Sequence, residues 1–163
     1  LAAGGAKIPA LAVAGGFSFE DHIFKALSMG APFVKLVGMA RAPIAAAMVG
    51  KTIGRAIEQN QVPVYVERFG RTIDEVFVTS THLRDELGND EFERLPAGAI
   101  GLYTYYERLA QGLRQLMAGS RKFNTTFISR DDLCALTKEA AERSGIPFVM
   151  EVDHERSMSI LDG

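Results

Sequence analysis

The chain of 163 residues has little cysteine, no excess of charge of one sign and no long hydrophobic run. The single cysteine, Cys134, excludes an internal disulfide and a metal site built from cysteines alone. Because 18 Lys and Arg residues nearly balance 20 Asp and Glu residues, the charge argues against a nucleic-acid partner. No apolar run approaches the roughly 20 residues of a membrane-spanning helix, and no signal-peptide pattern opens the chain. These absences predict a cytoplasmic protein with no membrane partner.

What the chain does contain changes along its length. Overall it is 47% hydrophobic and 23% charged, which is typical of a globular protein. Residues 1–50 are rich in Ala and Gly and poor in charge, whereas charged and aromatic residues become frequent from about Ile57. We therefore predict a boundary that separates residues 1–60 from residues 61–163.

The first part of the chain predicts alternating strands and helices. The short apolar runs 8–14 and 33–37 are typical of strands that are covered on both faces. A helix is expected after Ser18 up to Gly30, and a second helix from Pro43 to about Glu58. This order is a strand–helix–strand–helix unit, which normally forms parallel strands.

The second part of the chain predicts mainly helices. Thr72 and Glu75 have the spacing of a capping box at a helix start, and a long helix is expected from Pro96 to about Gly119. A further capped helix is expected over residues 129–145, and the apolar run 146–152 could form a last strand.

Two small-residue turns follow the two predicted strands, and each leads directly into a helix. Glycine lets a backbone approach an anion closely, and the N–H groups at a helix N-terminus favour phosphate. Arg41 adds a planar cationic donor suited to phosphate oxygens. Turn-making alone explains the glycines equally well, so spacing leaves both readings open. The candidate binding residues are Gly15, Gly16, Phe17, Ser18, Gly38, Met39, Ala40 and Arg41.

Other motifs carry weaker predictions. Gly50-Lys51-Thr52 matches the end of a phosphate-binding Walker A loop, but Ala45 stands where that loop needs Gly and the segment lies within a predicted helix. Lys35 is mid-strand, where an ion-paired structural lysine is favoured over a ligand contact. The three histidines lack metal-ligand spacing, and the three neighbouring tyrosines predict core packing or a subunit contact: His22, His82, His154, Tyr103, Tyr105 and Tyr106.

The stretch from Leu11 to Arg41 resembles the end of the FMN-binding barrel of glutamate synthase and its relatives. The shared pattern is a strand, Gly-Gly, a helix, a Gly-Ala turn, a second strand and a turn ending in Arg. Residues 112–123 resemble the tail of the FMN-binding glutamate synthase-like proteins. The resemblance implies an α/β fold: strands 7 and 8 of a (β/α)8 TIM barrel over residues 1–60, then a mainly helical extension over residues 61–163.

The resemblance also implies a function. Gly15, Gly16 and the following Phe17 and Ser18 would hold the FMN phosphate from strand 7, and residues 38–41 would hold it from strand 8. The parent enzyme would be an FMN-dependent oxidoreductase that acts on 2-oxoglutarate with ammonia or glutamine-derived ammonia. No residue qualifies as catalytic, and residues 38–60 lack the cysteines of the family's iron–sulphur cluster.

A barrel of about 250 residues needs more strands than this chain supplies. We therefore expect a preceding barrel segment or another chain as a partner, with a homo-oligomer left open. Two alternatives remain: a phosphate-binding TIM barrel without flavin, and a non-catalytic segment that mediates oligomerisation.

Overall fold

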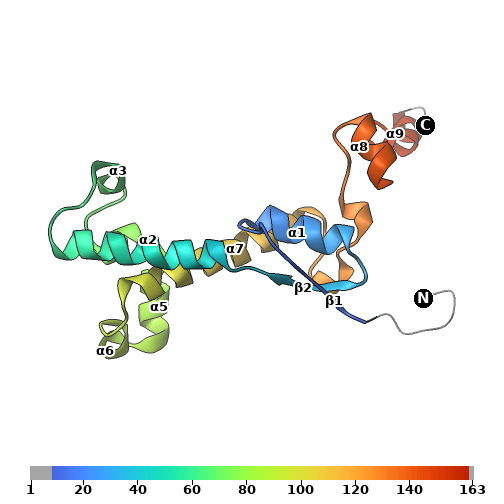
Figure 1. The fold of residues 1–163 in the computed structure, drawn as a ribbon. Helices are drawn as coiled ribbons and strands as arrows, with labels where there is room; N and C mark the ends of the chain where they lie inside the picture. Colours follow the sequence, from blue (N-terminus) through green and yellow to red (C-terminus); the bar gives the residue numbers. More distant parts are fainter. Residues whose placement is uncertain (1–8, 162–163) are drawn as a thin grey trace. The chain divides into compact units, whose positions relative to one another are not determined.

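The computed structural model describes residues 9–161, except for the side chains of residues 155 and 156 (Figure 1). The chain forms two compact units. One unit comprises Ala14–Glu20 and Gly38–Arg114, and we call it the central unit because its residues lie in the middle of the sequence. The other comprises, within the described residues, 9–13, Asp21–Val37 and 115–161, and we call it the flanking unit because its segments begin and end the described sequence. The predicted boundary between residues 60 and 61 stays a prediction.

Two short strands form the sheet. β1 (Leu11–Ala14) pairs with β2 (Val34–Gly38), and the backbone N–H of Leu11 donates to the carbonyl oxygen of Phe33 over 2.9 Å. The helix α1 (Glu20–Met29) connects the strands, and α2 (Arg41–Glu58) follows β2. The local strand–helix–strand–helix order predicted for this region is therefore present. Ile8, the first residue of the predicted strand, lies outside the described residues.

Helices form most of the remaining chain. The long helix α7 confirms the prediction for residues 96–119, whereas the helix expected over residues 129–145 is a 3₁₀ turn followed by a short helix. The elements are α3 (Val64–Glu67), α4 (Ile73–Val76), α5 (Ser80–Leu87), α6 (Asn89–Phe92), α7 (Ala97–Gly119), 3₁₀ turns at Thr125–Phe127 and Arg130–Asp132, α8 (Lys138–Ser144) and α9 (His154–Leu161). No helix among residues 9–161 is both long and apolar enough to cross a membrane.

The predicted fold class is wrong. The described chain is 60% helical with a two-stranded parallel sheet, and it is not strands 7 and 8 of a TIM barrel followed by an extension. Within the described residues each strand has one neighbour, whereas a barrel strand needs two. The apolar run 146–152, expected to be a strand, makes one isolated bridge, between Ala135 and Phe148, and then turns.

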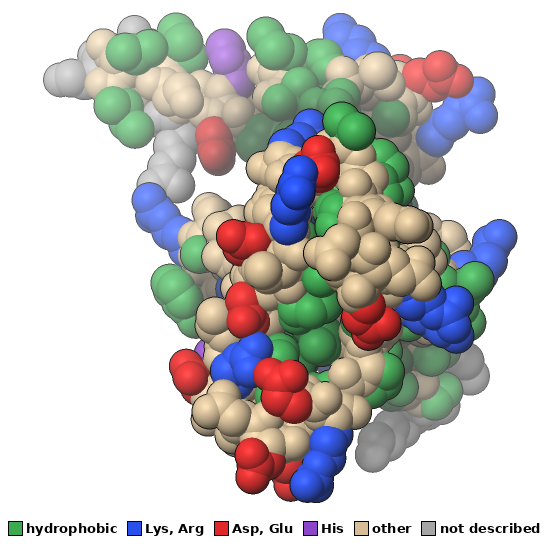
Figure 2. Space-filling model, turned by 90° about the vertical axis from the view of Figure 1, so that its left-hand side faces the viewer, with side chains coloured by type: hydrophobic (Ala, Val, Ile, Leu, Met, Phe, Trp, Pro, Cys, Tyr) green, Lys and Arg blue, Asp and Glu red, His purple; other side chains and the backbone are tan. Residues whose placement is uncertain are grey.

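The core of the central unit lies where α4, α5, α6 and α7 meet. Phe77, Leu83, Phe92 and Ile100 are buried together, and Ile53 of α2 packs against them. Such a cluster supplies the apolar burial that stabilises short helices, which are marginal alone. Large apolar side chains also remain exposed elsewhere, and Figure 2 shows hydrophobic side chains between charged ones on one face.

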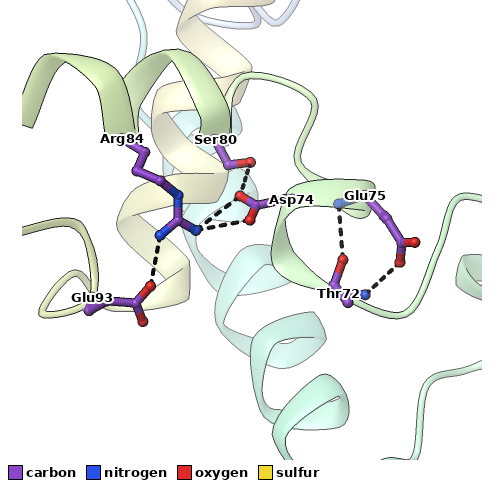
Figure 3. A network of polar contacts seen from close by, with 6 residues as sticks. All are labelled: Thr72, Asp74, Glu75, Ser80, Arg84 and Glu93. Carbon is purple, nitrogen blue, oxygen red and sulfur yellow. Dashed lines mark hydrogen bonds and ion pairs between the residues drawn. The ribbon is translucent and has the colours of Figure 1, made fainter. Parts of the chain in front are cut away.

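A network of polar side chains lies beside this core (Figure 3). The fully buried Ser80 donates from Oγ to Asp74 over 2.8 Å, and the Arg84 guanidinium donates to Asp74 over 2.9 Å. Arg84 also donates to Glu93 over 2.8 Å, and its guanidinium carbon lies 3.9 Å from the centre of the Phe92 ring. The network thus ties α4, α5 and α6 together over the buried aromatic ring.

Glycines bring α2 and α7 into close contact (Figure 1). A Cβ atom added to Gly50 would lie 2.8 Å from the carbonyl oxygen of Ala97, and one added to Gly101 would lie 2.9 Å from the Cα of Gly50. A Cβ atom at Gly98 would similarly lie 2.8 Å from the carbonyl oxygen of Ala47. The two backbones therefore touch along a strip that only glycine permits.

We predict that Gly50→Ala destabilises the central unit by about 1–3 kcal/mol, because the new methyl group meets backbone atoms that cannot rotate away. The free energy of unfolding in urea, followed by circular dichroism, measures the effect. Gly119→Ala is the matched control in α7, since a Cβ atom there meets nothing within 4 Å. We expect the control to be neutral or slightly stabilising. Equal stability of the two variants would contradict the contact.

A second prediction concerns the capping box, which the structure confirms at α4. The Glu75 carboxylate accepts hydrogen bonds from the backbone N–H groups of Arg71 and Thr72, over 2.8 and 3.0 Å. These bonds, that from Arg71 first, hold the pKa of Glu75 below its usual value of 4.5. The contribution of the Glu75 carboxylate to the free energy of unfolding is therefore complete above pH 4.5, and it disappears as the pH falls through the lowered pKa.

We expect the stability advantage of the wild-type chain over Glu75→Gln to shrink between about pH 6 and about pH 3. Urea unfolding of both proteins at each pH measures it, and the variant corrects for the other carboxylates. An advantage that does not change with pH would exclude this role of the carboxylate.

Candidate functional site

The first turn of the site follows β1. Gly15 and Gly16 have φ angles of 113° and 76°, in a region of backbone conformation that residues with a Cβ atom rarely adopt. Because a Cβ atom at either position would meet nothing within 4 Å, the space beside this turn is open. The sequence requires glycine here for conformation, and the open space leaves the backbone accessible to a ligand.

The second turn follows β2 and leads into α2. Gly38, Met39 and Ala40 connect the strand to Arg41, the first residue of the helix. Ala40 is the N-cap residue and has no side chain that can accept a hydrogen bond from the first turn. The N–H groups of a helix start carry partial positive charge and need an acceptor. An anion is one acceptor that suits them.

The two turns line one cavity of about 950 Å³ in the central unit. All eight residues predicted as binding residues from the sequence border it: Gly15, Gly16, Phe17, Ser18, Gly38, Met39, Ala40 and Arg41. The parallel pairing of β1 and β2 explains this arrangement, because the carboxyl ends of parallel strands lie at the same edge of a sheet. That these residues bind a cofactor stays a prediction.

Several lining residues were not predicted. One set lies on α2 with the spacing i, i+3, i+4 and i+7, which places it on one helix face: Ala42, Ala45, Ala46 and Val49. That spacing was a usable signal in the sequence. Phe19 and Tyr105 complete the apolar wall, and Tyr105 comes from α7, far along the chain. No local pattern could have indicated Tyr105.

Arg41 is the one charged side chain among the described residues that line the cavity, and it is exposed to solvent. The hydroxyl of Tyr105 donates to the carbonyl oxygen of Ser18 over 2.8 Å. The pKa of Tyr105 is raised, mainly by burial and to a smaller extent by the charges of the nearby Tyr106 and Glu20. The phenol therefore stays protonated and keeps its hydrogen for donation at neutral pH.

The other sequence candidates do not join this cavity. Gly50-Lys51-Thr52 lies within α2, where Gly50 packs against α7 and the Thr52 hydroxyl donates to the Met48 carbonyl oxygen over 3.0 Å. This segment is thus a helix and not a phosphate-binding loop. Lys35 borders a separate hollow of about 40 Å³ in the flanking unit, beside Thr125 and Thr126.

His22, His82 and the other tyrosines make local contacts. His82 pairs through Nδ1 with the Tyr103 hydroxyl over 2.7 Å, and the rings of Tyr105 and Tyr106 meet edge to face at 5.6 Å. The Nε2 atom of His22 lies 4.0 Å from the Oδ1 atom of Asp21. Within residues 9–161 there is no group of three or more His, Cys, Asp or Glu side chains that could hold a metal ion.

The site therefore combines backbone N–H groups, one arginine and apolar walls, an arrangement that suits a ligand with a phosphate at one end. Comparison with protein-family models, with curated proteins and with solved structures finds no match for the chain.

Proposed function

We propose that the cavity at the ends of β1 and β2 binds the phosphate group of a flavin cofactor, FMN. The observation that carries the proposal is the convergence on one cavity of the Gly15-Gly16 turn, the uncapped start of α2 and Arg41. Each feature alone is common in proteins. Together they supply backbone donors, a helix dipole and a cation to the same space.

The charge of the site fits a phosphate monoester. Such a group carries about −1.5 to −2 charges at pH 7 and offers three acceptor oxygens. Arg41 provides a planar set of donors that matches those oxygens. The start of α2 adds roughly 0.3–1 kcal/mol for a nearby negative charge. No carboxylate lines the described cavity, and the Glu20 carboxylate, which raises the pKa of Tyr105, lies near one wall of it.

The size and walls of the cavity support a ligand larger than phosphate itself. A volume of about 950 Å³ lies at the upper end of the range for small-molecule sites, which is roughly 300–1,000 Å³. The face of α2 with Ala42 and Val49, together with Phe19 and Tyr105, offers apolar surface to an organic group. FMN has both a phosphate and a large aromatic ring system.

The resemblance to glutamate synthase-like proteins is the reason to name FMN and not another organic phosphate. We accordingly propose that the chain is part of an FMN-dependent oxidoreductase that acts on 2-oxoglutarate with ammonia or glutamine-derived ammonia. When bound, the flavin supplies the electron-transfer chemistry. The residues of this chain bind and orient its phosphate, and we assign none of them a proton-transfer role.

Arg41→Gln tests the proposal, because it removes the cation and keeps a polar side chain. We expect about a tenfold loss of FMN affinity, measured by the change in flavin fluorescence on binding. Riboflavin, which lacks the phosphate, should bind weakly to the wild-type chain. Its affinity for the Arg41→Gln variant should be the same as for the wild-type chain. Arg55→Gln is the matched control, since Arg55 is also exposed on α2 but does not line the cavity.

Two outcomes would contradict the proposal. Equal binding of FMN and riboflavin would show that the phosphate is not recognised. Binding of inorganic phosphate, reduced by Arg41→Gln, without any binding of FMN would instead support a phosphate ligand that is not a flavin.

Gly16→Ala tests the role of backbone conformation. Gly16 has φ 76° and open space around it, so the substitution introduces strain without a clash. A left-handed conformation costs a non-glycine residue roughly 1 kcal/mol, which corresponds to about a fivefold loss of FMN affinity if the turn relaxes away. Gly88→Ala is the matched control, because Gly88 has φ 83° and equally open space but does not line the cavity. A similar loss of affinity in both variants would contradict a specific role of the turn.

A further inference from the structure

One hydrogen bond joins α7 to the glycine turn of the cavity. The Tyr105 hydroxyl donates to the carbonyl oxygen of Ser18 over 2.8 Å, and the two residues are 87 positions apart in the sequence. Both residues line the cavity, and both belong to the central unit. The bond therefore links the turn that follows β1 to a helix that the chain forms much later.

This bond is made at the end of the glycine turn that follows β1. Gly15 and Gly16 give the turn its shape, and glycine has more accessible backbone conformations than any other residue. A hydrogen bond to the Ser18 carbonyl fixes the peptide group between Ser18 and Phe19. Fixing that group restricts the turn from its far end.

The partner in this bond is held firmly. Tyr105 lies four residues after Gly101, so both residues are on the same face of α7. Gly101 lies against Gly50 of α2, with no room for a side chain between the two backbones. The helix face that carries Tyr105 is therefore fixed against the same helix, α2, whose first turn borders the cavity.

The neighbouring tyrosines make different contacts. Tyr103 pairs with His82, and Tyr106 packs its ring against that of Tyr105 and is 47% exposed. Among the three tyrosines, Tyr105 is the one that lines the cavity.

We propose that Tyr105 is a positioning residue of the phosphate site: by holding the Ser18 carbonyl, it keeps the Gly15–Ser18 turn in the conformation that receives the phosphate. The role rests on the proposed function of the cavity. It goes beyond that function because it makes a residue of α7 part of the determinants of affinity. Tyr105 acts through the turn and not through contact with a reacting atom.

Tyr105→Phe tests the role, because it removes the hydroxyl and keeps the ring in the apolar wall. A lost hydrogen bond of about 1 kcal/mol corresponds to about a fivefold loss of FMN affinity, measured with the full chain by flavin fluorescence. Riboflavin affinity should stay unchanged, since riboflavin has no phosphate. Tyr103→Phe is the matched control, because it also removes a hydrogen-bonded hydroxyl from α7 but away from the cavity.

A spectroscopic readout separates positioning from a general effect on stability. In Tyr105→Phe, the carbonyl ¹³C resonance of Ser18 and the amide ¹⁵N resonance of Phe19 should shift, because both belong to the peptide group that loses its donor. Tyr103→Phe should leave both resonances in place. Unchanged resonances in Tyr105→Phe would overturn the proposal, since the hydrogen bond would then not exist in solution.

The binding data distinguish the failure of this role from the failure of the proposed function. If the wild-type chain binds FMN and Tyr105→Phe binds it equally well, the positioning role is wrong and the phosphate site stands. If the wild-type chain binds neither FMN nor inorganic phosphate, the proposed function is wrong and the positioning role falls with it.

Discussion

The close contact between α2 and α7 is the constraint on which the central unit depends. At Gly50 and Gly101 the two backbones meet without side chains between them, and neither helix can move apart without losing that contact. The same pair of helices contributes Ile100 to the buried cluster beside α4, α5 and α6, and Ile53 packs against that cluster. The packing of α2 against α7 therefore positions residues of both the core and the cavity. A substitution at Gly50 or Gly101 is expected to change the packing of both.

The candidate site presents backbone groups from two turns and few polar side chains. Two turns present N–H groups, and Arg41 is the one charged side chain among the described lining residues. Because Arg41 is exposed, solvent screens its attraction for a phosphate. In the function that we propose, the conformation of the Gly15-Gly16 turn therefore contributes to phosphate affinity alongside Arg41. In the function that we propose, the site binds and orients the ligand, and the reaction chemistry comes from the ligand itself.

The sequence predicted the local features of the site but not the fold around it. Residues such as Gly16 and Arg41 were predicted to meet because each follows a strand of a strand–helix–strand unit, and that unit exists. The barrel was wrong because the local pattern of such a unit is the same whether two strands or eight stand side by side. The number of strands depends on pairing partners, which residues 11–58 do not encode.

Tyr105 shows the other limit of sequence reasoning. Its neighbours Tyr103 and Tyr106 have the same chemistry, and helical spacing alone predicts only which of the three share a face. The role that we propose for it follows from the packing of α7 against α2, which depends on Gly50 and Gly101 and not on a feature near Tyr105. A contact over 87 positions is thus set by the absence of side chains elsewhere. The long helix reaches the cavity through its packing against α2, so the role that we propose for Tyr105 couples the stability of α7 to the ligand affinity of the cavity.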